Sequence, residues 1–265
     1  MPVTTRRLLR PMSQDDFAKR SYDLMGVLFG IRNKMGRLFD EKTYKRALAA
    51  HSQGLLLEEP ISITFRDFTK TYFIDALVND GAILEFKAVE TLSTAHQAQL
   101  LQYLMLTDLR HGLLVNVRSE EVERRYVNST MSHADRTDFT IDDSRYDGSM
   151  AVAALVRTTL VEVLRDWGTG LEIPLYVEVM THFLGGEERV ERDVPVTLDG
   201  LSLGHQRMRL AADRIAFKVT AFEDQSSQAR FETHATKLLS HVELDAMLWV
   251  NIARHLVTFR TLRQE

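Results

Sequence analysis

Three charged residues in the first half of the chain have the types and spacing of a metal-dependent hydrolytic site. Glu85 and Lys87 lie two residues apart in an apolar run, so both side chains face the same side of a predicted strand. Asp75 lies on the preceding predicted strand and can reach that side. Two carboxylates offer oxygen ligands to Mg²⁺ or Mn²⁺, and such an ion polarises a phosphoryl oxygen and acidifies a water. Lys87 can orient that water or offset charge on phosphorus.

A Glu-x-Lys pair alone is weak, because about one is expected by chance in a chain of this length. A purely structural strand, whose acid–lysine cluster is an ion-pair network, gives the same pattern. The surrounding residues are apolar, however: Ile83, Leu84, Phe86, Ala88 and Val89. An acid and a base inside such a run cost free energy unless a metal, a partner or a substrate uses them. We therefore interpret the cluster as functional, with the ion-pair network as the alternative.

Residue periodicity predicts the elements that position this cluster. In chain order these are helices over 21–34 and 40–52, strands over 59–66, 70–78 and 82–89, a helix over 94–108 and a short buried strand over 111–118. Asn79-Asp80-Gly81 predicts a tight turn that makes a hairpin of the strands carrying Asp75 and Glu85. The cluster is thus expected on one face of a β-hairpin.

Four other polar residues are weaker candidates for the same site. Gln99 and Tyr103 are four residues apart and share a helical face, where they can contact water or a nucleic-acid backbone. His96 lies one turn earlier, and a histidine satisfied at a helix start is the favoured explanation for it. Glu41 lies near the start of an earlier helix, where an acid is favoured by the helix dipole.

Composition limits the classes of protein that fit. The 265 residues include no cysteine, which excludes disulfides and thiolate chemistry, and the apolar share of 45% supports ordinary cores. No run approaches the roughly 18 apolar residues that span a bilayer, so we expect a soluble, cytoplasmic protein with no membrane partner. The formal net charge is −4, yet residues 1–50 hold 11 Lys and Arg against 5 Asp and Glu. A basic N-terminal segment can contact phosphates, although a solvated helix face explains it as well.

The second half repeats the order of the first. Gly36 lies eight residues before Tyr44, and Gly168 lies eight before Tyr176. The segment ILEFKAVE at 83–90 is similar to AFKVTAFE at 216–223, and AQLLQYL at 98–104 is similar to TKLLSHV at 236–242. We therefore predict an internal duplication, with a basic extension over 1–20, a first domain over 21–128, a linker over 129–150 and a second domain over 151–265.

The second copy is predicted to lack the site. The corresponding pairs are Asp75 with Met208, Glu85 with Lys218, Lys87 with Thr220, Glu41 with Ile173, Gln99 with Lys237 and Tyr103 with His241. A lysine in place of a metal ligand repels a cation. We expect this copy to complete a pseudo-dimer or to hold nucleic acid, with Lys218, Arg207 and Arg209 available for phosphate.

The first half resembles the GxxExxY family of the PD-(D/E)xK nuclease superfamily over about residues 21–128. The opening signature resembles Gly36 to Tyr44 followed by Ala47-Leu48, although Leu38 stands where the family has glycine. The active-site strands resemble 73–78 and 83–90, and the next helix resembles His96 to Leu104, whose Gln-x-x-x-Tyr also matches RecB-type nucleases.

This resemblance implies an α/β, restriction-endonuclease-like core with a mixed sheet flanked by helices. It implies Asp75 and Glu85 as ligands of Mg²⁺ or Mn²⁺, Lys87 as the catalytic lysine, Glu41 as an auxiliary acidic ligand, and Gln99 and Tyr103 as supporting residues. The expected function is hydrolysis of phosphodiester bonds in nucleic acid, in DNA rather than RNA. The alternative is a non-catalytic module of the same fold that binds nucleic acid or protein. A protein partner or homodimer stays open.

Overall fold

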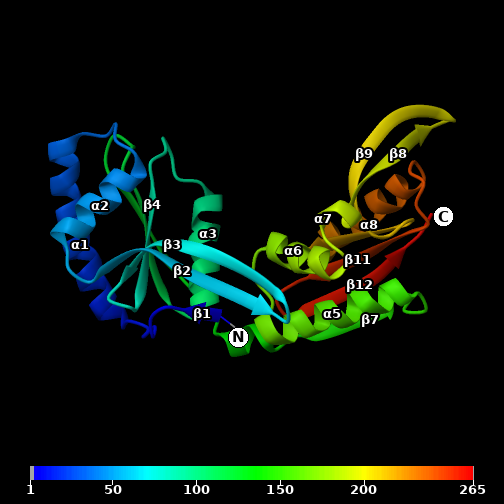
Figure 1. Ribbon diagram of the computed structural model, residues 1–265, viewed down its shortest axis with the longest axis horizontal. Coiled ribbons are helices and arrows are strands. Elements are labelled where there is room, and N and C mark those ends of the chain that lie inside the picture. The colour runs from blue at the N-terminus through cyan, green and yellow to red at the C-terminus, as the bar shows by residue number, and fades with distance from the viewer. Residues whose placement is uncertain (1–2, 265) are drawn as a thin grey trace. The chain divides into compact units, whose positions relative to one another are not determined.

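The computed structural model describes residues 3–264 and divides into two compact units between His133 and Ala134. Within that described range, each unit has its own six-stranded mixed sheet with helices packed on it (Figure 1). This agrees with the mixed α/β class expected from the sequence. None of the described helices is both long enough and apolar enough to cross a bilayer.

The first unit orders its sheet as β1-β2-β3-β4-β5-β6, and only the β4–β5 pair is parallel. Its strands are β1 (Val3–Thr5), β2 (Leu55–Phe65), β3 (Phe68–Val78), β4 (Ala82–Lys87), β5 (His111–Asn116) and β6 (Glu123–Asn128), and its helices are α1 (Gln14–Met35), α2 (Glu41–His51) and α3 (Thr94–Thr107). The α3 crossover between β4 and β5 makes the parallel pair possible.

Both faces of the first sheet are covered by helices. On one face, α1 and α2 bury Leu28, Tyr44 and Leu48 against Leu84 and Phe86 of β4. On the other face, α3 packs on β4 and β5 (Figure 1). There Gly112 of β5 allows Leu100 to approach, since a Cβ at this position would lie 2.9 Å from a Leu100 methyl. A central strand covered on both faces is expected to be apolar throughout.

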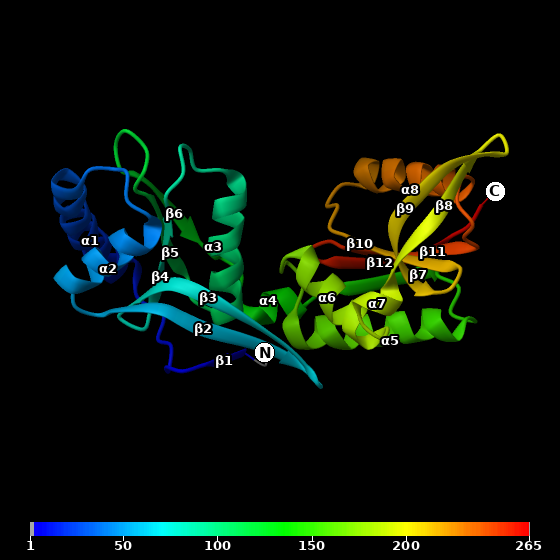
Figure 2. The ribbon, with the colours of Figure 1, turned by 45° about the horizontal axis from the view of Figure 1, so that its top comes forward.

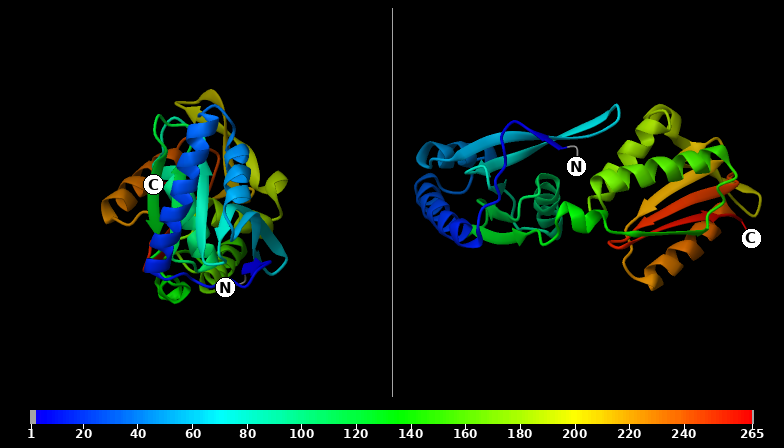
Figure 3. Two further views of the ribbon diagram at one scale, coloured as in Figure 1. Left: turned by 90° about the vertical axis from the view of Figure 1, so that its left-hand side faces the viewer. Right: turned by 90° about the horizontal axis from the view of Figure 1, so that it is seen from below.

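The second unit orders its sheet as β7-β12-β11-β10-β9-β8, with β10–β11 and β12–β7 parallel. Its strands are β7 (Thr140–Arg145), β8 (Glu191–Leu198), β9 (Leu201–Ala212), β10 (Ile215–Thr220), β11 (Ala246–Ile252) and β12 (Leu256–Leu262), and its helices are α4 (His133–Thr137), α5 (Ala151–Trp167), α6 (Ile173–Phe183), α7 (Glu187–Val190) and α8 (Gln225–Leu239). The helices α5 and α8 lie on opposite faces of this sheet (Figures 2 and 3).

Two predicted segments differ from the structure. Residues 129–150, expected as a linker, contain α4 and the strand β7, which pairs with β12 as an edge strand. Within α4, Arg136 is fully buried because its guanidinium donates to the carbonyl oxygen of Trp167, 2.8 Å away. Residues 1–20, expected as an extension, include β1 and the first turns of α1. Both segments therefore contribute to packed units.

Candidate active site

The β3–β4 hairpin places Asp75 and Glu85 opposite each other. Asn79 and Asp80 both have positive φ, 47° and 57°, which is the conformation of the tight turn predicted from Asn-Asp-Gly. The strands pair Ala76 with Leu84, and the next step of this register sets Asp75 against Glu85. Directly opposed side chains on an antiparallel pair project to one face. The expected convergence of the two carboxylates is therefore present in the backbone.

Both carboxylates are buried, but their hydrogen bonding differs. Asp75 uses both oxygens, since Oδ1 accepts from Lys45 Nζ at 2.8 Å and Oδ2 from the Phe86 amide at 2.8 Å. Glu85 is 1% exposed, and its Oε1 accepts from Lys87 Nζ at 2.6 Å. Its Oε2 is buried and has no hydrogen-bond partner among residues 3–264. An unpartnered buried carboxylate oxygen is costly, so this atom marks where a ligand fits best.

Lys45 of α2 is a site residue that the sequence analysis missed. Its side chain is 7% exposed and lies 2.5 Å from Glu58 and 3.5 Å from Glu41, in addition to Asp75. Burial alone would lower the pKa of this ammonium, but hydrogen bonds to Asp75 and Glu58 outweigh burial and raise its pKa. A lysine four residues after Glu41 on one helical face was the only sequence signal.

Glu41 lies in the site without capping its helix. The N-cap of α2 is Asp40, whose side chain accepts from the Thr43 amide. Glu41 is the first residue of α2 and faces Lys45. Burial and the charge of Asp75 raise the pKa of Glu41, although Lys87 and Lys45 act in the opposite direction. The capping role that the sequence suggested as an alternative thus belongs to its neighbour.

The electrostatics of the cluster favour a cation. Burial, followed by the negative charge of Asp75, raises the pKa of Glu85 to about 7 against the opposing effect of Lys87. Four carboxylates, of Glu41, Glu58, Asp75 and Glu85, face two ammonium groups, of Lys45 and Lys87. When all are ionised, the excess is two negative charges, which is the charge of one divalent ion.

The donor set fits Mg²⁺ or Mn²⁺. Mg²⁺ is commonly held by one or two carboxylates together with waters and substrate phosphate oxygens, and Asp75 and Glu85 supply two. In their present side-chain positions, the described residues contain no group of three or more His, Asp or Glu side chains arranged to hold a metal. Glu41 is therefore close to the pair but not converged on it.

Gln99 and Tyr103 form a separate pair on α3. Gln99 Nε2 donates to the Tyr103 hydroxyl at 3.0 Å, and the Tyr103 ring meets Tyr72 edge to face at 6.0 Å. Their mutual contact agrees with the shared helical face expected from their spacing. His96 accepts from the Ser93 amide at 3.1 Å and completes the capping box of α3, which is the structural reading of that histidine.

Comparison with known proteins covers the first unit. Residues 18–129 match the PD-(D/E)XK nuclease superfamily. This range includes Glu41, Lys45 and the whole β3–β4 hairpin. No curated protein matches the chain. A solved structure titled "Crystal structure of SSO0001" is 14% identical, and the match spans 42% of this chain and 68% of that one with a TM-score of 0.26.

In the second unit, the strand positions predicted to correspond to this site hold other residues. The β9–β10 pair aligns Leu210 with Ala216, and the continued register sets Met208 against Lys218. Both line one hollow with Ile173, the first residue of α6. These are the residues that the sequence analysis paired with Asp75, Glu85 and Glu41. None of the three is a carboxylate.

The residues predicted as counterparts of Gln99 and Tyr103 do not hold equivalent helix positions. Helix α8 ends at Leu239, so His241 lies outside it. The caps of the two helices, Ser93 and Asp224, instead align Gln99 with Arg230 and Tyr103 with His234. The match of AQLLQYL at 98–104 with TKLLSHV at 236–242 differs from this cap-based alignment by about two helical turns. The N-caps therefore align the two helices at a different offset from the one given by matching their leucines.

Proposed function

We propose that the first unit is a Mg²⁺- or Mn²⁺-dependent nuclease that hydrolyses phosphodiester bonds of nucleic acid. One observation carries the proposal. Asp75 and Glu85 are opposed and buried on adjacent strands, Lys87 lies on the same face, and one oxygen of Glu85 has no partner among the described residues. The superfamily match over residues 18–129 supports the same reaction class.

The residues have separable roles in this proposal. Asp75 and Glu85 hold the ion, which supplies Lewis-acid polarisation of the phosphate and an acidified water. Lys87, 2.6 Å from Glu85, is placed to hold the attacking water and to offset negative charge that grows on phosphorus. Lys45 is a positioning residue that fixes Asp75 Oδ1. Glu41, Gln99 and Tyr103 are proposed as an auxiliary acid and as substrate contacts.

A cleavage assay on the full chain tests the proposal. Single-stranded, duplex and branched DNA, and RNA, are incubated with Mg²⁺, with Mn²⁺ and with EDTA. We expect cleavage of DNA with either ion, none with EDTA, and loss of cleavage in Lys87→Ala. Lys34→Ala, which removes an exposed lysine at the end of α1, is the matched control and should cleave normally. Equal behaviour of wild type and Lys87→Ala on every substrate would refute the assignment.

A non-catalytic binding module is the second candidate. The observation in its favour is that each lysine already pairs with a carboxylate, Lys45 with Asp75 and Lys87 with Glu85, as a structural ion-pair network would. The module predicts retention of DNA or a protein in EDTA, without cleavage when Mg²⁺ or Mn²⁺ is added. The same set of substrates, run in a binding format, separates the two candidates.

We also propose that the second unit is a degenerate copy of the first. Two helices, an antiparallel three-stranded meander, a crossover helix and an antiparallel final pair occur in the same order in both units. Tyr44 donates to the carbonyl of Gly36, and Tyr176 donates to that of Gly168 at 2.6 Å, eight residues apart in each case. Asn116 and Asn251 accept from the amides of Val89 and Phe222 after the site strand.

A further inference from the structure

The second unit has a hollow at the place of the first unit's carboxylates. Its volume is about 590 Å³, and it lies between the start of α6, the strands β9 and β10, and one side of α8. Ile173, Met208 and Lys218, the counterparts of Glu41, Asp75 and Glu85, all line it, as does His234. The hollow holds none of the first unit's carboxylate pair, and a pocket of a few hundred Å³ suits a small ligand.

Lys218 gives this pocket an ammonium group without an ion-pair partner among the described residues. Among residues 3–264, no carboxylate lies within ion-pair distance of its ammonium, and the side chain is exposed. Arg207 and Arg209 also line the pocket, but both pair with Glu191, at 3.3 and 2.8 Å. Lys218 is therefore the cation that can still pair with a ligand anion, and its three N–H donors suit a phosphate group.

The rest of the wall is apolar or able to accept hydrogen bonds. Phe231 is half-buried and backed by Trp249, with ring centroids 4.8 Å apart, which fixes one face of its ring. Met208 and Val177 line the pocket with it. Two carboxylates, of Glu178 and Glu187, complete the lining and can accept from hydroxyl groups. Aromatic and thioether surfaces are good partners for the flat face of a base.

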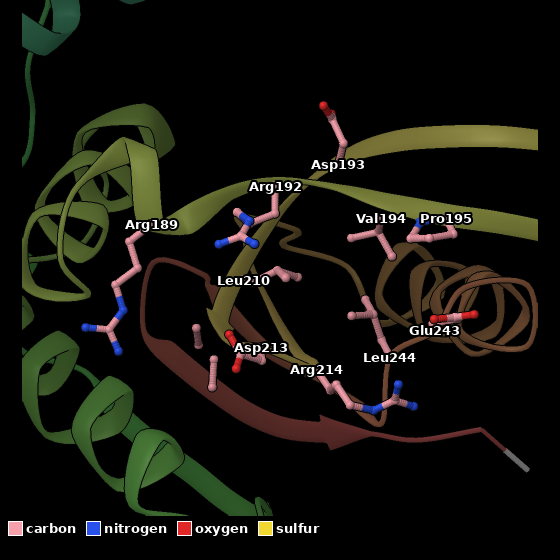
Figure 4. Close-up of a pocket in the computed structure, with 12 residues that line it drawn as sticks. Arg189, Arg192, Asp193, Val194, Pro195, Leu210, Asp213, Arg214, Glu243 and Leu244 are labelled. Carbon is pink, nitrogen blue, oxygen red and sulfur yellow. The ribbon is translucent and has the colours of Figure 1, made fainter.

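A second hollow in this unit makes a useful contrast. It measures about 490 Å³ and is lined by three arginines, Arg189, Arg192 and Arg214, and by three acids, Asp193, Asp213 and Glu243 (Figure 4). Its formal charges cancel, and Arg214 is already paired with Asp245 at 2.8 Å. It has no aromatic side chain in its wall. Of the two hollows, the Lys218 pocket is the one that combines an unpaired ammonium group with an aromatic side chain.

We propose that the Lys218 pocket binds a nucleoside monophosphate without a metal ion, either free or as the phosphorylated end of a strand. Lys218 receives the phosphate, Phe231 and Met208 contact the base, and Glu178 or Glu187 accepts from the sugar. An anion without a base would leave the apolar wall unused, and a purely apolar ligand would leave Lys218 unpaired. The proposal is independent of cleavage by the first unit.

Calorimetric titration of the full chain with AMP, in EDTA, tests this directly. EDTA removes any metal-bridged binding at Asp75 and Glu85. We expect saturable binding that adenosine and inorganic phosphate each reproduce only weakly. Lys218→Ala should weaken it about tenfold, the loss of one charge-assisted hydrogen bond. Met208→Glu, which puts a carboxylate opposite Lys218, should abolish it.

Controls separate this result from folding and from cleavage. Lys237→Ala removes an exposed lysine on α8 that does not line the pocket, and it should bind AMP as the wild type does. Fluorescence of the buried Trp249 reports whether each variant is folded. Lys87→Ala should keep AMP binding, even if cleavage proves absent. Competition by 5′-phosphorylated but not 5′-hydroxyl oligothymidylate identifies a strand end as a source. Absence of AMP binding, or equal affinity in a folded Lys218→Ala, overturns the proposal.

Discussion

The two units have a similar order of helices and strands, but they carry different side chains at the opposed positions of their hairpins. In the first, opposed strands bury two carboxylates with two lysines against them. In the second, Met208 and Lys218 occupy the opposed positions and a pocket opens. The backbone alone therefore does not determine the chemistry of this site. If both proposals hold, the identity of three side chains decides whether the site attracts a cation or an anion.

The largest effect is expected from a variant that removes the proposed cation site of the first unit. Glu85→Gln keeps the shape but loses the charge, so we expect cleavage with Mg²⁺ to fall about a thousandfold. Initial rates on the best substrate measure this. Glu90→Gln makes the same change at an exposed position beyond β4 and should cleave normally. Unchanged cleavage in Glu85→Gln would mean that the carboxylate pair is not the reaction centre.

The next largest effect is expected at Lys45, whose ammonium group pairs with both Asp75 and Glu58. Lys45→Met leaves Asp75 and Glu58 without their shared partner, and we expect the first unit to lose about 3–5 kcal/mol of unfolding free energy in EDTA. Mn²⁺ should restore more stability to this variant than to wild type, because the ion takes over charge that the ammonium balanced. Urea unfolding followed by circular dichroism tests it. Mn²⁺ rescue no larger than in wild type would contradict a metal site at Asp75.

A smaller effect tests whether the shared tyrosine contact supports each unit separately. Both tryptophans, Trp167 and Trp249, are buried in the second unit, so tryptophan fluorescence follows that unit alone. Tyr176→Phe loses the bond to Gly168 and also leaves the Leu171 amide without its acceptor. We expect it to lower stability by about 1–3 kcal/mol.

The matched change in the first unit is Tyr44→Phe. It removes the bond to Gly36, and we expect it to leave the midpoint of the tryptophan-fluorescence transition unchanged while shifting the circular dichroism transition. Coupled shifts of both signals in both variants would show that the units unfold together.

A further expected effect is a pH dependence confined to the first unit. The folded-state pKa of Glu85 is raised to about 7, whereas a glutamate in the unfolded chain titrates near 4.3. Between these two values the unfolded chain binds fewer protons than the folded chain does. The stability of the fold therefore decreases as pH rises from about 4.3 towards 7.

Mn²⁺ should oppose this loss by binding the ionised carboxylate in the folded state. Melting curves at pH 5 and pH 7.5, with and without Mn²⁺, measure the difference. Glu85→Gln removes the titrating group and should flatten the dependence, and a slope that persists in this variant would assign it to another residue.

Local patterns were enough to predict the hairpin and its acids. Asn79-Asp80-Gly81 specifies the turn, and alternation places Glu85 and Lys87 on one face. Non-local packing was not predictable in the same way. Lys45 looks like an ordinary helix residue until α2 packs on the sheet beside Asp75.

The strand β7 escaped prediction for a related reason. It is an edge strand without buried residues in alternation, so it carries no period that distinguishes it from a loop. Arg136 is likewise buried only because distant carbonyl groups surround it. These features depend on contacts with parts of the chain far away in sequence.

The tyrosine that bonds back to a glycine carbonyl eight residues earlier has a practical consequence for finding similar chains. It occurs in both units, whereas the Asp, Glu and Lys of the hairpin occur in one. A search profile that gives most weight to the Asp, Glu and Lys of the hairpin would therefore miss units like the second. One weighted towards the Gly-x₇-Tyr spacing, together with the asparagine on the strand parallel to the site strand, would retrieve both kinds.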